Sequence, residues 1–210
     1  METSILRINK PEIKVVTLAT EEKGYFKWLK QSCERNGVNL TVLGMGMEWR
    51  GYMMKCELLK DMLENEDDNN IICVVDAYDV LMLKDVNSLR DDFIKFVSDN
   101  NCSIICTHDP VTDTGIKFFD MITTEIKCRH FNCSRTSGIN AGAYIGYVRS
   151  VKVLVNEMIR RCRELGEVDD QKILNELYNS GTSDIKIDMN KDFFKLTPFE
   201  DIIDRDDYIF

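Results

Sequence analysis

Two carboxylates follow a strongly apolar segment near the middle of the chain. The segment Ile71–Val75 is apolar without alternation, and Asp76 and Asp79 come directly after it, on either side of Ala77 and Tyr78. Such a run is typical of a strand buried on both faces of a mostly parallel sheet. Open α/β sheets bind ligands beyond the carboxyl ends of their strands. Two acids at that place can hold a hard divalent cation, which can in turn neutralise a diphosphate.

The Asp-x-x-Asp spacing fits a variant of the acidic motif of nucleotide-sugar transferases. Short acidic motifs also arise often by chance. The alternative is a strand followed by a turn, in which Asp76 is a cap and Asp79 lies in solvent. This stretch alone does not decide between the two interpretations.

Strand and helix patterns alternate around this segment. Such alternation favours an α/β fold with a right-handed, helix-flanked, mostly parallel sheet. The predicted strands are Lys14–Thr20, Asn39–Leu43, Ile71–Val75, Ser103–Thr107, one within Ser137–Val148, and Ser183–Met189. The predicted helices are Glu21–Asn36, Met53–Glu64, Leu89–Val97, about Ile116–Ile126, Ser150–Leu165 and Glu167–Tyr178.

Glycines mark two further places where a backbone could approach a ligand. The loop after Leu43, GMGMEWRGY, lacks the Gly-Lys-Ser/Thr of a P-loop, so that phosphate cradle is rejected. Gly138, Gly142 and Gly146 allow either close approach to a ligand or tight packing of a strand.

Composition indicates one domain, residues 1–210, with 44% apolar residues and a net charge of −9. The negative charge disfavours a general nucleic-acid groove. No apolar run approaches the ~20 residues needed to span a bilayer. The first residues lack the apolar core of a signal peptide, so we expect a cytoplasmic protein, or one of the endoplasmic reticulum lumen if the chain is a fragment of a longer precursor.

The chain has eight cysteines in irregular spacing, which resemble scattered reduced thiols more than a disulfide framework. Two groups include a histidine: Cys102, Cys106 and His108, and Cys128, His130 and Cys133. Neither group has the paired-cysteine spacing of a zinc finger or ribbon, so we do not expect a zinc site.

Five short motifs occur in one order along the chain: VVTLATEE (Val15–Glu22), VLGMGMEWRG (Val42–Gly51), VVDAYDV (Val74–Val80), INAGAYIG (Ile139–Gly146) and DDQ (Asp169–Gln171). Together they resemble the glycosyltransferase domain of procollagen lysyl hydroxylases and the related stand-alone collagen glucosyltransferases. The resemblance runs from about Val15 to Phe194. The polar, Asn- and Asp-rich sequence would suit a stand-alone member from a giant virus.

This resemblance implies a GT-A fold, a UDP-sugar donor and Mn²⁺. It also implies transfer of glucose, with retention, to the galactose on a hydroxylysine of collagen. By position, Asp76 and Asp79 match the metal ligands, Tyr78 matches a wall of the nucleotide site, and Thr17 matches a uridine contact.

Further residues match the donor and catalytic positions. Trp49 resembles a donor-site aromatic, Lys55 a lysine near the sugar-phosphate, and Asn140 the residue before the small-residue strand. Asp169 and Asp170 match acids beside the transferred sugar. Three of these have simpler alternatives: Trp49 as a core or loop-anchoring aromatic, Lys55 as a solvated lysine, and Asp169 and Asp170 as an acid pair at a helix N-terminus.

The sequence departs from the family pattern in two places. The family's third metal ligand is a histidine in a His-Gly-Asn stretch near the end of the domain, whereas His108 and His130 both come too early. The ligand could be lost, replaced, or cut off with a truncated C-terminus. The family's long Gly-rich stretch after Trp-Arg-Gly-Gly is shortened here to GYMMK.

We therefore carry three functional hypotheses. The first is the Mn²⁺-dependent retaining glucosyltransferase, and the second is a transferase for UDP-galactose or another UDP-hexose. The third is a non-catalytic module that binds UDP-sugars or collagen-like chains. The intact pair of Asp76 and Asp79 favours catalysis, and the missing histidine favours the module.

Overall fold

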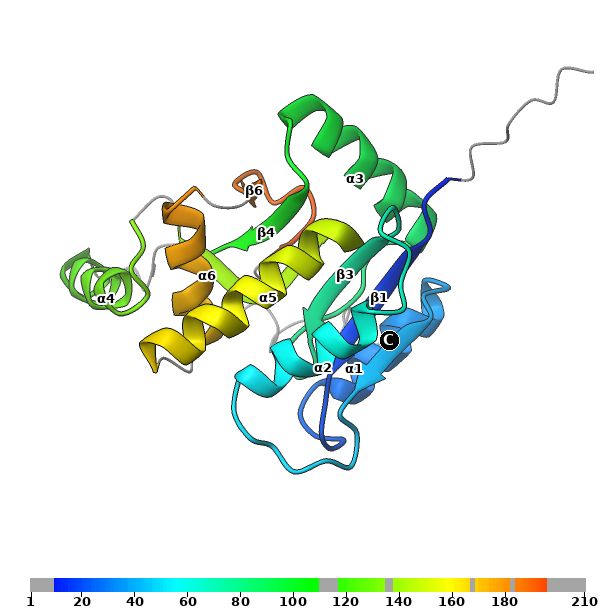
Figure 1. Ribbon diagram of the computed structural model, residues 1–210, viewed down its shortest axis with the longest axis horizontal. Coiled ribbons are helices and arrows are strands. Elements are labelled where there is room, and N and C mark those ends of the chain that lie inside the picture. Colours follow the sequence, from blue (N-terminus) through cyan, green and yellow to red (C-terminus); the bar gives the residue numbers. More distant parts are fainter. Residues whose placement is uncertain (1–9, 110–116, 135–137, 167–168, 182–183, 196–210) are drawn as a thin grey trace, which may run out of the picture.

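The centre of the protein is a six-stranded sheet in the order β2-β1-β3-β5-β4-β6 (Figure 1). The computed structural model describes residues 10–109, 117–134, 138–166, 169–181 and 184–195. The strands are β1 Ile13–Leu18, β2 Leu40–Leu43, β3 Ile71–Asp76, β4 Ile104–His108, β5 Ile139–Tyr147 and β6 Ile185–Asp188. The helices are α1 Phe26–Arg35, α2 Met53–Leu63, α3 Val86–Asn100, α4 Lys117–His130, α5 Val148–Leu165 and α6 Asp170–Asn179.

Five of the six strands share one direction. Strand β1 pairs in parallel with β2 and β3, β4 pairs in parallel with β6, and β5 is antiparallel to both β3 and β4. The predicted mostly parallel α/β fold is confirmed. Because β5 runs in reverse, its first residues lie at the same edge of the sheet as the last residues of β3 and β4.

Side chains that alternate along the strands build two apolar cores. Val16 and Val74 face one core, which helices α2, α5 and α6 cover. Val15 and Cys73 face the other, which α1 and α3 cover. Both faces of the sheet are thus buried, as the unbroken apolar run in β3 predicts.

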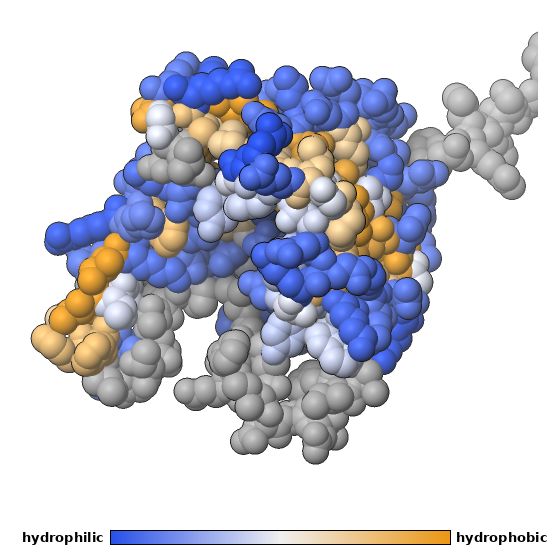
Figure 2. Space-filling model, turned by 90° about the horizontal axis from the view of Figure 1, so that it is seen from below, coloured by the Kyte–Doolittle hydropathy of each residue, from blue (hydrophilic) through white to orange (hydrophobic). Residues whose placement is uncertain are grey.

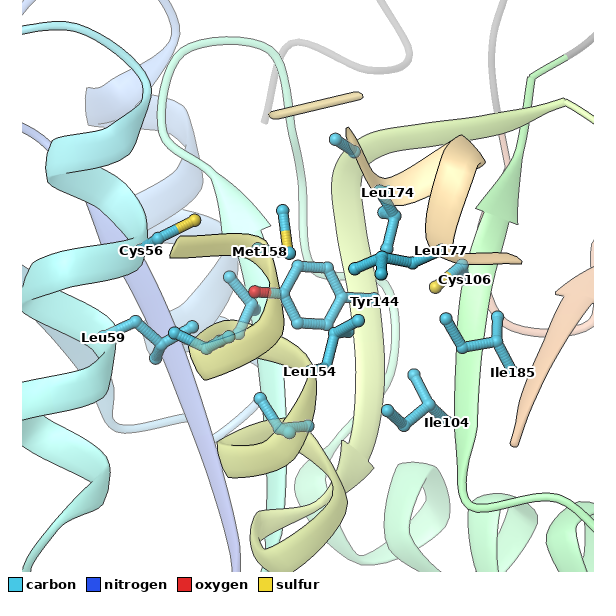
Figure 3. Packing of buried hydrophobic residues seen from close by; sticks show 14 of the residues in the cluster. Cys56, Leu59, Ile104, Cys106, Tyr144, Leu154, Met158, Leu174, Leu177 and Ile185 are labelled. Atoms are coloured by element: carbon cyan, nitrogen blue, oxygen red, sulfur yellow. The ribbon is translucent and has the colours of Figure 1, made fainter. Parts of the chain in front are cut away.

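Tyr144 of β5 lies in the middle of the first core (Figure 3). Its side chain is 3% exposed and points toward Cys56 of α2, while Leu174 and Leu177 of α6 lie on its other side. Burial raises the pKa of the Tyr144 phenol well above its ordinary value. This packing fixes α2 and α6 to the same strand, and both helices contribute to the site described below.

The pairing of β4 with β5 is interrupted at one point. The register moves from Cys106 opposite Tyr144 to Thr107 opposite Asn140, so that β5 has additional residues at its start. The Thr107 hydroxyl donates a hydrogen bond to the Ala143 carbonyl across 2.7 Å and holds this bulge. Bulges often redirect side chains beside functional sites.

Helix α1 begins at Phe26, whereas its predicted start was Glu21. The chain between these residues turns instead, and Gly24 has a φ of +52°. The turn lies against the loop after β3: the Tyr25 amide donates to the Tyr78 carbonyl across 3.3 Å. This contact with the loop after β3 therefore takes the place of the helical turn that the sequence favours between Glu21 and Tyr25.

The other boundaries lie within a few residues of prediction, apart from those of α3 and α4. Helix α4 ends at His130 rather than at about Ile126. Helix α3 begins at Val86, before the predicted Leu89, because the Asp85 side chain accepts hydrogen bonds from the amides of Asn87 and Ser88. Some predicted bounds, such as Ile116 and Glu167, lie outside the described residues.

Helix α4 lies at the margin of the molecule and buries only Thr124 among its described side chains. Apolar side chains gather on its outer side, at the left of Figure 2. They are Phe118, Phe119, Met121, Ile122 and Ile126, all at least 40% exposed. None of the described helices combines the length and the apolarity needed to cross a bilayer.

All eight cysteines are free thiols, and five of them are buried. Burial raises the pKa of Cys56 and of Cys73 to about 12, so both remain protonated at neutral pH. Within the described residues, no group of three or more His, Cys, Asp or Glu is arranged for a metal ion.

Candidate active site

Three charged side chains from different elements meet at the carboxyl end of β3. Lys55 of α2 donates a hydrogen bond to Asp76 Oδ1 across 2.7 Å, and its Nζ lies 3.6 Å from Asp170 Oδ2. Lys55 also donates to the Ala141 carbonyl at the start of β5, across 3.0 Å. We call Lys55, Asp76 and Asp170 the Lys55 cluster. It joins α2, β3, β5 and α6 at one point.

Burial and charge act against each other in this cluster. Burial alone would lower the pKa of Lys55, but the carboxylates of Asp76 and Asp170 raise it overall. The pKa of Asp170 is raised by its burial, even though Lys55 opposes the change. The alternative of a solvated lysine is wrong here, because the Lys55 side chain is only 11% exposed.

Asp79 adds a further carboxylate to this edge of the sheet. Its pKa is raised by burial and by the charge of Asp76, while Lys55 opposes the rise. Three carboxylates at this edge, those of Asp76, Asp79 and Asp170, thus share one ammonium, that of Lys55. The excess of negative charge favours binding of a cation.

The donor set of Asp76 and Asp79 fits a hard divalent cation. Magnesium-like ions are commonly held by one or two carboxylates, with waters and substrate phosphates as the other ligands. A third protein ligand is not present in a cluster among the described residues, so phosphate oxygens and water would have to complete such a site. The pair would hold the ion, and Lys55 would remain beside it as a second positive charge.

Asn140 lies at the same place, inside β5 rather than before it, and its role in donor binding stays a prediction. Its Oδ1 accepts a hydrogen bond from the Gly142 amide across 2.7 Å. A Cβ added at Gly142 would come 2.7 Å from Asn140 Oδ1 and 3.0 Å from Asp76 Oδ2, so a larger residue there would displace one or both of these side chains. Gly146 is different: a Cβ there would meet Ile104 and Val151 at 2.9 Å, which is tight packing of the strand.

Tyr78 forms part of a wall beside the end of β3. Its ring packs edge-on against Phe26, with centroids 6.4 Å apart, and its hydroxyl donates to the Glu21 carbonyl across 3.2 Å. Lys23 Nζ lies 5.3 Å from the ring centroid. The turn that precedes α1 thus fixes the position of Tyr78.

The described contacts of Thr17 and Trp49 do not include the residues of the Lys55 cluster. Thr17 is fully buried, and its hydroxyl has no hydrogen-bond partner within the described residues, so a uridine contact stays a prediction. Trp49 is 47% exposed and packs edge-on against Tyr52, with centroids 5.8 Å apart. The core alternative for Trp49 is therefore wrong, whereas a donor-site role stays a prediction.

Asp169 and Asp170 differ in their surroundings although they are adjacent. Asp169 is the N-cap of α6: its Oδ1 accepts from the Lys172 amide across 3.0 Å, and its Oδ2 lies 3.5 Å from His130 Nε2. Asp170 is 8% exposed and faces Lys55. The helix-cap interpretation thus fits Asp169, and the structure assigns Asp170 to the charged cluster.

No sequence pattern assigned a role to Asp109 or Lys127, and Gln171 appeared only as the last residue of the DDQ motif. Gln171 Nε2 donates to Asp109 Oδ2 across 3.1 Å, and Lys127 of α4 forms an ion pair with the same carboxylate. One signal was available: Asp109 follows a predicted strand, as Asp76 does, and belongs to the same edge of the sheet.

The family model of the PLOD GT domain, a glycosyltransferase domain, matches residues 9–201. The chain belongs to this family. Since the match covers nearly the whole sequence, the geometry described above is that of a glycosyltransferase domain.

Similar proteins carry this domain as one part of a longer chain. The human multifunctional procollagen lysine hydroxylase and glycosyltransferase LH3 is 25% identical over 205 residues, which cover 88% of this chain and 24% of that protein. A Caenorhabditis elegans protein described as a multifunctional procollagen lysine hydroxylase and glycosyltransferase is 33% identical over 99 residues, 42% of this chain and 14% of that one. The Drosophila melanogaster procollagen-lysine,2-oxoglutarate 5-dioxygenase is 27% identical over 192 residues, 86% of this chain and 24% of that one. The chain spans about a quarter or less of their length.

A solved glycosyltransferase involved in glycosylation of the major capsid of PBCV-1 has a similar fold. Its TM-score is 0.51 at 10% identity, over 84% of this chain and 82% of that one. This likeness concerns the fold alone, and it agrees with the predicted glycosyltransferase architecture.

Proposed function

We propose that the chain is a Mn²⁺-dependent retaining glucosyltransferase. It moves glucose from UDP-glucose to galactosyl-hydroxylysine of collagen-like chains. The observation that carries the proposal is the Lys55 cluster beside Asp79, in a chain of the PLOD GT domain family.

Each residue of the cluster has a chemical role in such a transfer. The bond between the anomeric carbon and the diphosphate breaks, and its electron pair leaves with the phosphate oxygen. Asp76 and Asp79 would hold a bound Mn²⁺, and the charge of this ion would stabilise that oxygen. Lys55 would add a second positive charge that acts most strongly in the transition state.

Asp170 would act on the sugar rather than on the phosphate. The anomeric carbon gains positive charge as the bond breaks, and a buried carboxylate nearby stabilises that charge. The acceptor hydroxyl oxygen forms the new bond to the anomeric carbon, and its proton passes to the departing diphosphate oxygen. The low polarity around Asp170 makes its interaction with the developing cation stronger than it would be in water.

The alternative donor is UDP-galactose or another UDP-hexose, since no described contact distinguishes the sugars. The alternative of another class is a non-catalytic module that binds UDP-sugars or collagen-like chains. One observation favours the module: the described residues do not gather a third metal ligand with Asp76 and Asp79.

One experiment separates these candidates. The purified chain is incubated with UDP-glucose or UDP-galactose, with or without Mn²⁺, and with peptides that carry hydroxylysine or galactosyl-hydroxylysine. We expect transfer from UDP-glucose to the galactosylated peptide only when Mn²⁺ is present. Preferred turnover of UDP-galactose supports the second candidate, and donor binding without turnover supports the module.

A further inference from the structure

Asp109 is a buried carboxylate at the carboxyl end of β4, outside the residues that the proposed reaction uses. It is 8% exposed, and its own amide donates to the Gly138 carbonyl across 2.8 Å. One carboxylate oxygen accepts from Lys127 of α4, and the other accepts from Gln171 Nε2 across 3.1 Å. Both oxygens are therefore engaged by donors from different helices.

Gln171 links Asp109 to the start of β5 through hydrogen bonds at both ends of its side-chain amide. Its Oε1 accepts a hydrogen bond from the Ala141 amide across 3.3 Å, while its Nε2 donates to Asp109. The carbonyl of the same Ala141 accepts from Lys55 across 3.0 Å. Both ends of the Gln171 amide are thus used, which fixes its orientation.

Gln171 also follows Asp170 directly at the first turn of α6. One turn later, Asn175 makes two hydrogen bonds with the backbone of Ile139, of 2.9 and 3.0 Å. The start of α6 is therefore attached to β5 by two side-chain amides, and one of them depends on Asp109.

We propose that Asp109 is a positioning residue of the transferase centre: it fixes Gln171, and through Gln171 it holds Asp170 opposite Lys55. This role rests on the proposed function, because it acts on the residues assigned to the transfer. Asp109 itself contacts Gln171 and Lys127, and its described contacts include neither Lys55 nor Asp170.

The donors around Asp109 explain why a carboxylate is required there. Asn in its place has a single acceptor oxygen and a donor amide. With that oxygen toward Lys127, the Asn amide would face the amide nitrogen of Gln171, donor against donor. Gln171 would then have to rotate, which would break its hydrogen bond to Ala141. The first turn of α6 would lose one of its two attachments to β5.

The contact can be rebuilt with reversed polarity. In the double variant Asp109→Asn/Gln171→Glu, the Asn oxygen can accept from Lys127, and its amide can donate to the new carboxylate. The second oxygen of that carboxylate can accept from the Ala141 amide. Net charge is unchanged, and every hydrogen bond of the original arrangement has a counterpart.

The test compares the full chain with Asp109→Asn, the double variant, and the exposed control Asp61→Asn on α2. Transfer kinetics and donor affinity are measured, together with amide hydrogen exchange over residues 169–179 in the ligand-free protein. We expect Asp109→Asn to lower kcat at least ~10-fold, with donor KM changed less than ~2-fold and faster exchange at the start of α6. The double variant should recover kcat to within ~3-fold of wild type.

Several outcomes overturn the proposal. A purely structural ion pair predicts a lower melting temperature with unchanged kcat in the surviving folded protein. Failure of the double variant to recover kcat, or exchange in α6 that Asp109→Asn leaves unaltered, also rejects the positioning role. A wild-type chain without any transfer rejects the proposed function instead, and the exchange data still decide whether Asp109 fixes α6.

Discussion

The Lys55 ammonium donates a hydrogen bond to Asp76 Oδ1 across 2.7 Å, between residues 21 positions apart. One carboxylate therefore serves two partners in the proposed reaction: a lysine at one oxygen and a divalent cation at the site it shares with Asp79. In the proposed reaction, this contact would keep a positive charge beside the leaving diphosphate as it gains negative charge.

Replacement of Lys55 with Met should impair both stability and turnover. Asp170 and Asp76 would lose their shared donor, and leaving a buried carboxylate without its partner costs about 3–5 kcal/mol. Transfer should fall at least ~100-fold, because the positive charge near the leaving group is lost. Chemical unfolding and steady-state kinetics measure the two effects, with Lys60→Met on the same helix as the control. Wild-type turnover in Lys55→Met would contradict the role of this ammonium.

The metal assignment makes a separate prediction for Asp76 and Asp79. Either residue changed to Ala should abolish the Mn²⁺-dependent part of UDP binding, because two carboxylates are the ligands that the described site offers. Titration calorimetry with UDP, in Mn²⁺ and in chelator, measures this part directly. Asp61→Ala is the matched control. Unchanged Mn²⁺-dependent affinity in both variants would remove the metal site.

The raised pKa of Asp170 predicts a pH dependence of stability in the metal-free protein. Burial raises this pKa above its ordinary value of 3.8, although Lys55 opposes the rise. The folded state thus binds the proton more tightly than the unfolded chain, and ionisation of Asp170 costs stability as the pH increases from the ordinary value through the raised one. In Asp170→Asn this cost is absent.

The free energy of unfolding of Asp170→Asn, relative to wild type, should therefore increase with pH across that window. Urea unfolding in chelator at a series of pH values gives this difference. A difference that stays constant with pH, or decreases, would mean that the Asp170 pKa is not raised.

Much of the fold follows from local patterns in the sequence. The apolar run of β3 predicted a strand buried on both faces, and this is confirmed, because such a run consists of residues that are adjacent in the chain. The two acids after it lie at the carboxyl end of this strand, and their role as metal ligands stays a prediction.

The parts that were not predicted depend on contacts between distant residues. The direction of β5 comes from its insertion between β3 and β4, which no local signal encodes. The start of α1 is shifted by the contact between Tyr25 and Tyr78. Asp109, Lys127 and Gln171 meet only because α4, β4 and α6 come together in space.

The adjacent acids at the start of α6 allow the sharpest separation of chemistry from stability. Asp169 caps the helix and lies at its outer end, whereas Asp170 is buried opposite Lys55. Asp169→Asn keeps an oxygen that can cap, so it should cost at most about 1 kcal/mol of stability and leave turnover near wild type.

Asp170→Asn keeps the shape of the side chain but removes its charge. That charge matters most when the anomeric carbon is cationic, so its loss should reduce turnover more than donor affinity. We expect UDP-glucose to bind nearly normally in Mn²⁺, and transfer or hydrolysis to be at least ~100-fold slower, a loss of about 2.7 kcal/mol in transition-state stabilisation. Turnover, donor affinity and melting temperature are measured on both folded variants. Normal turnover in Asp170→Asn would reject its catalytic assignment, and an equal loss in Asp169→Asn would show that the two acids act together on the sugar.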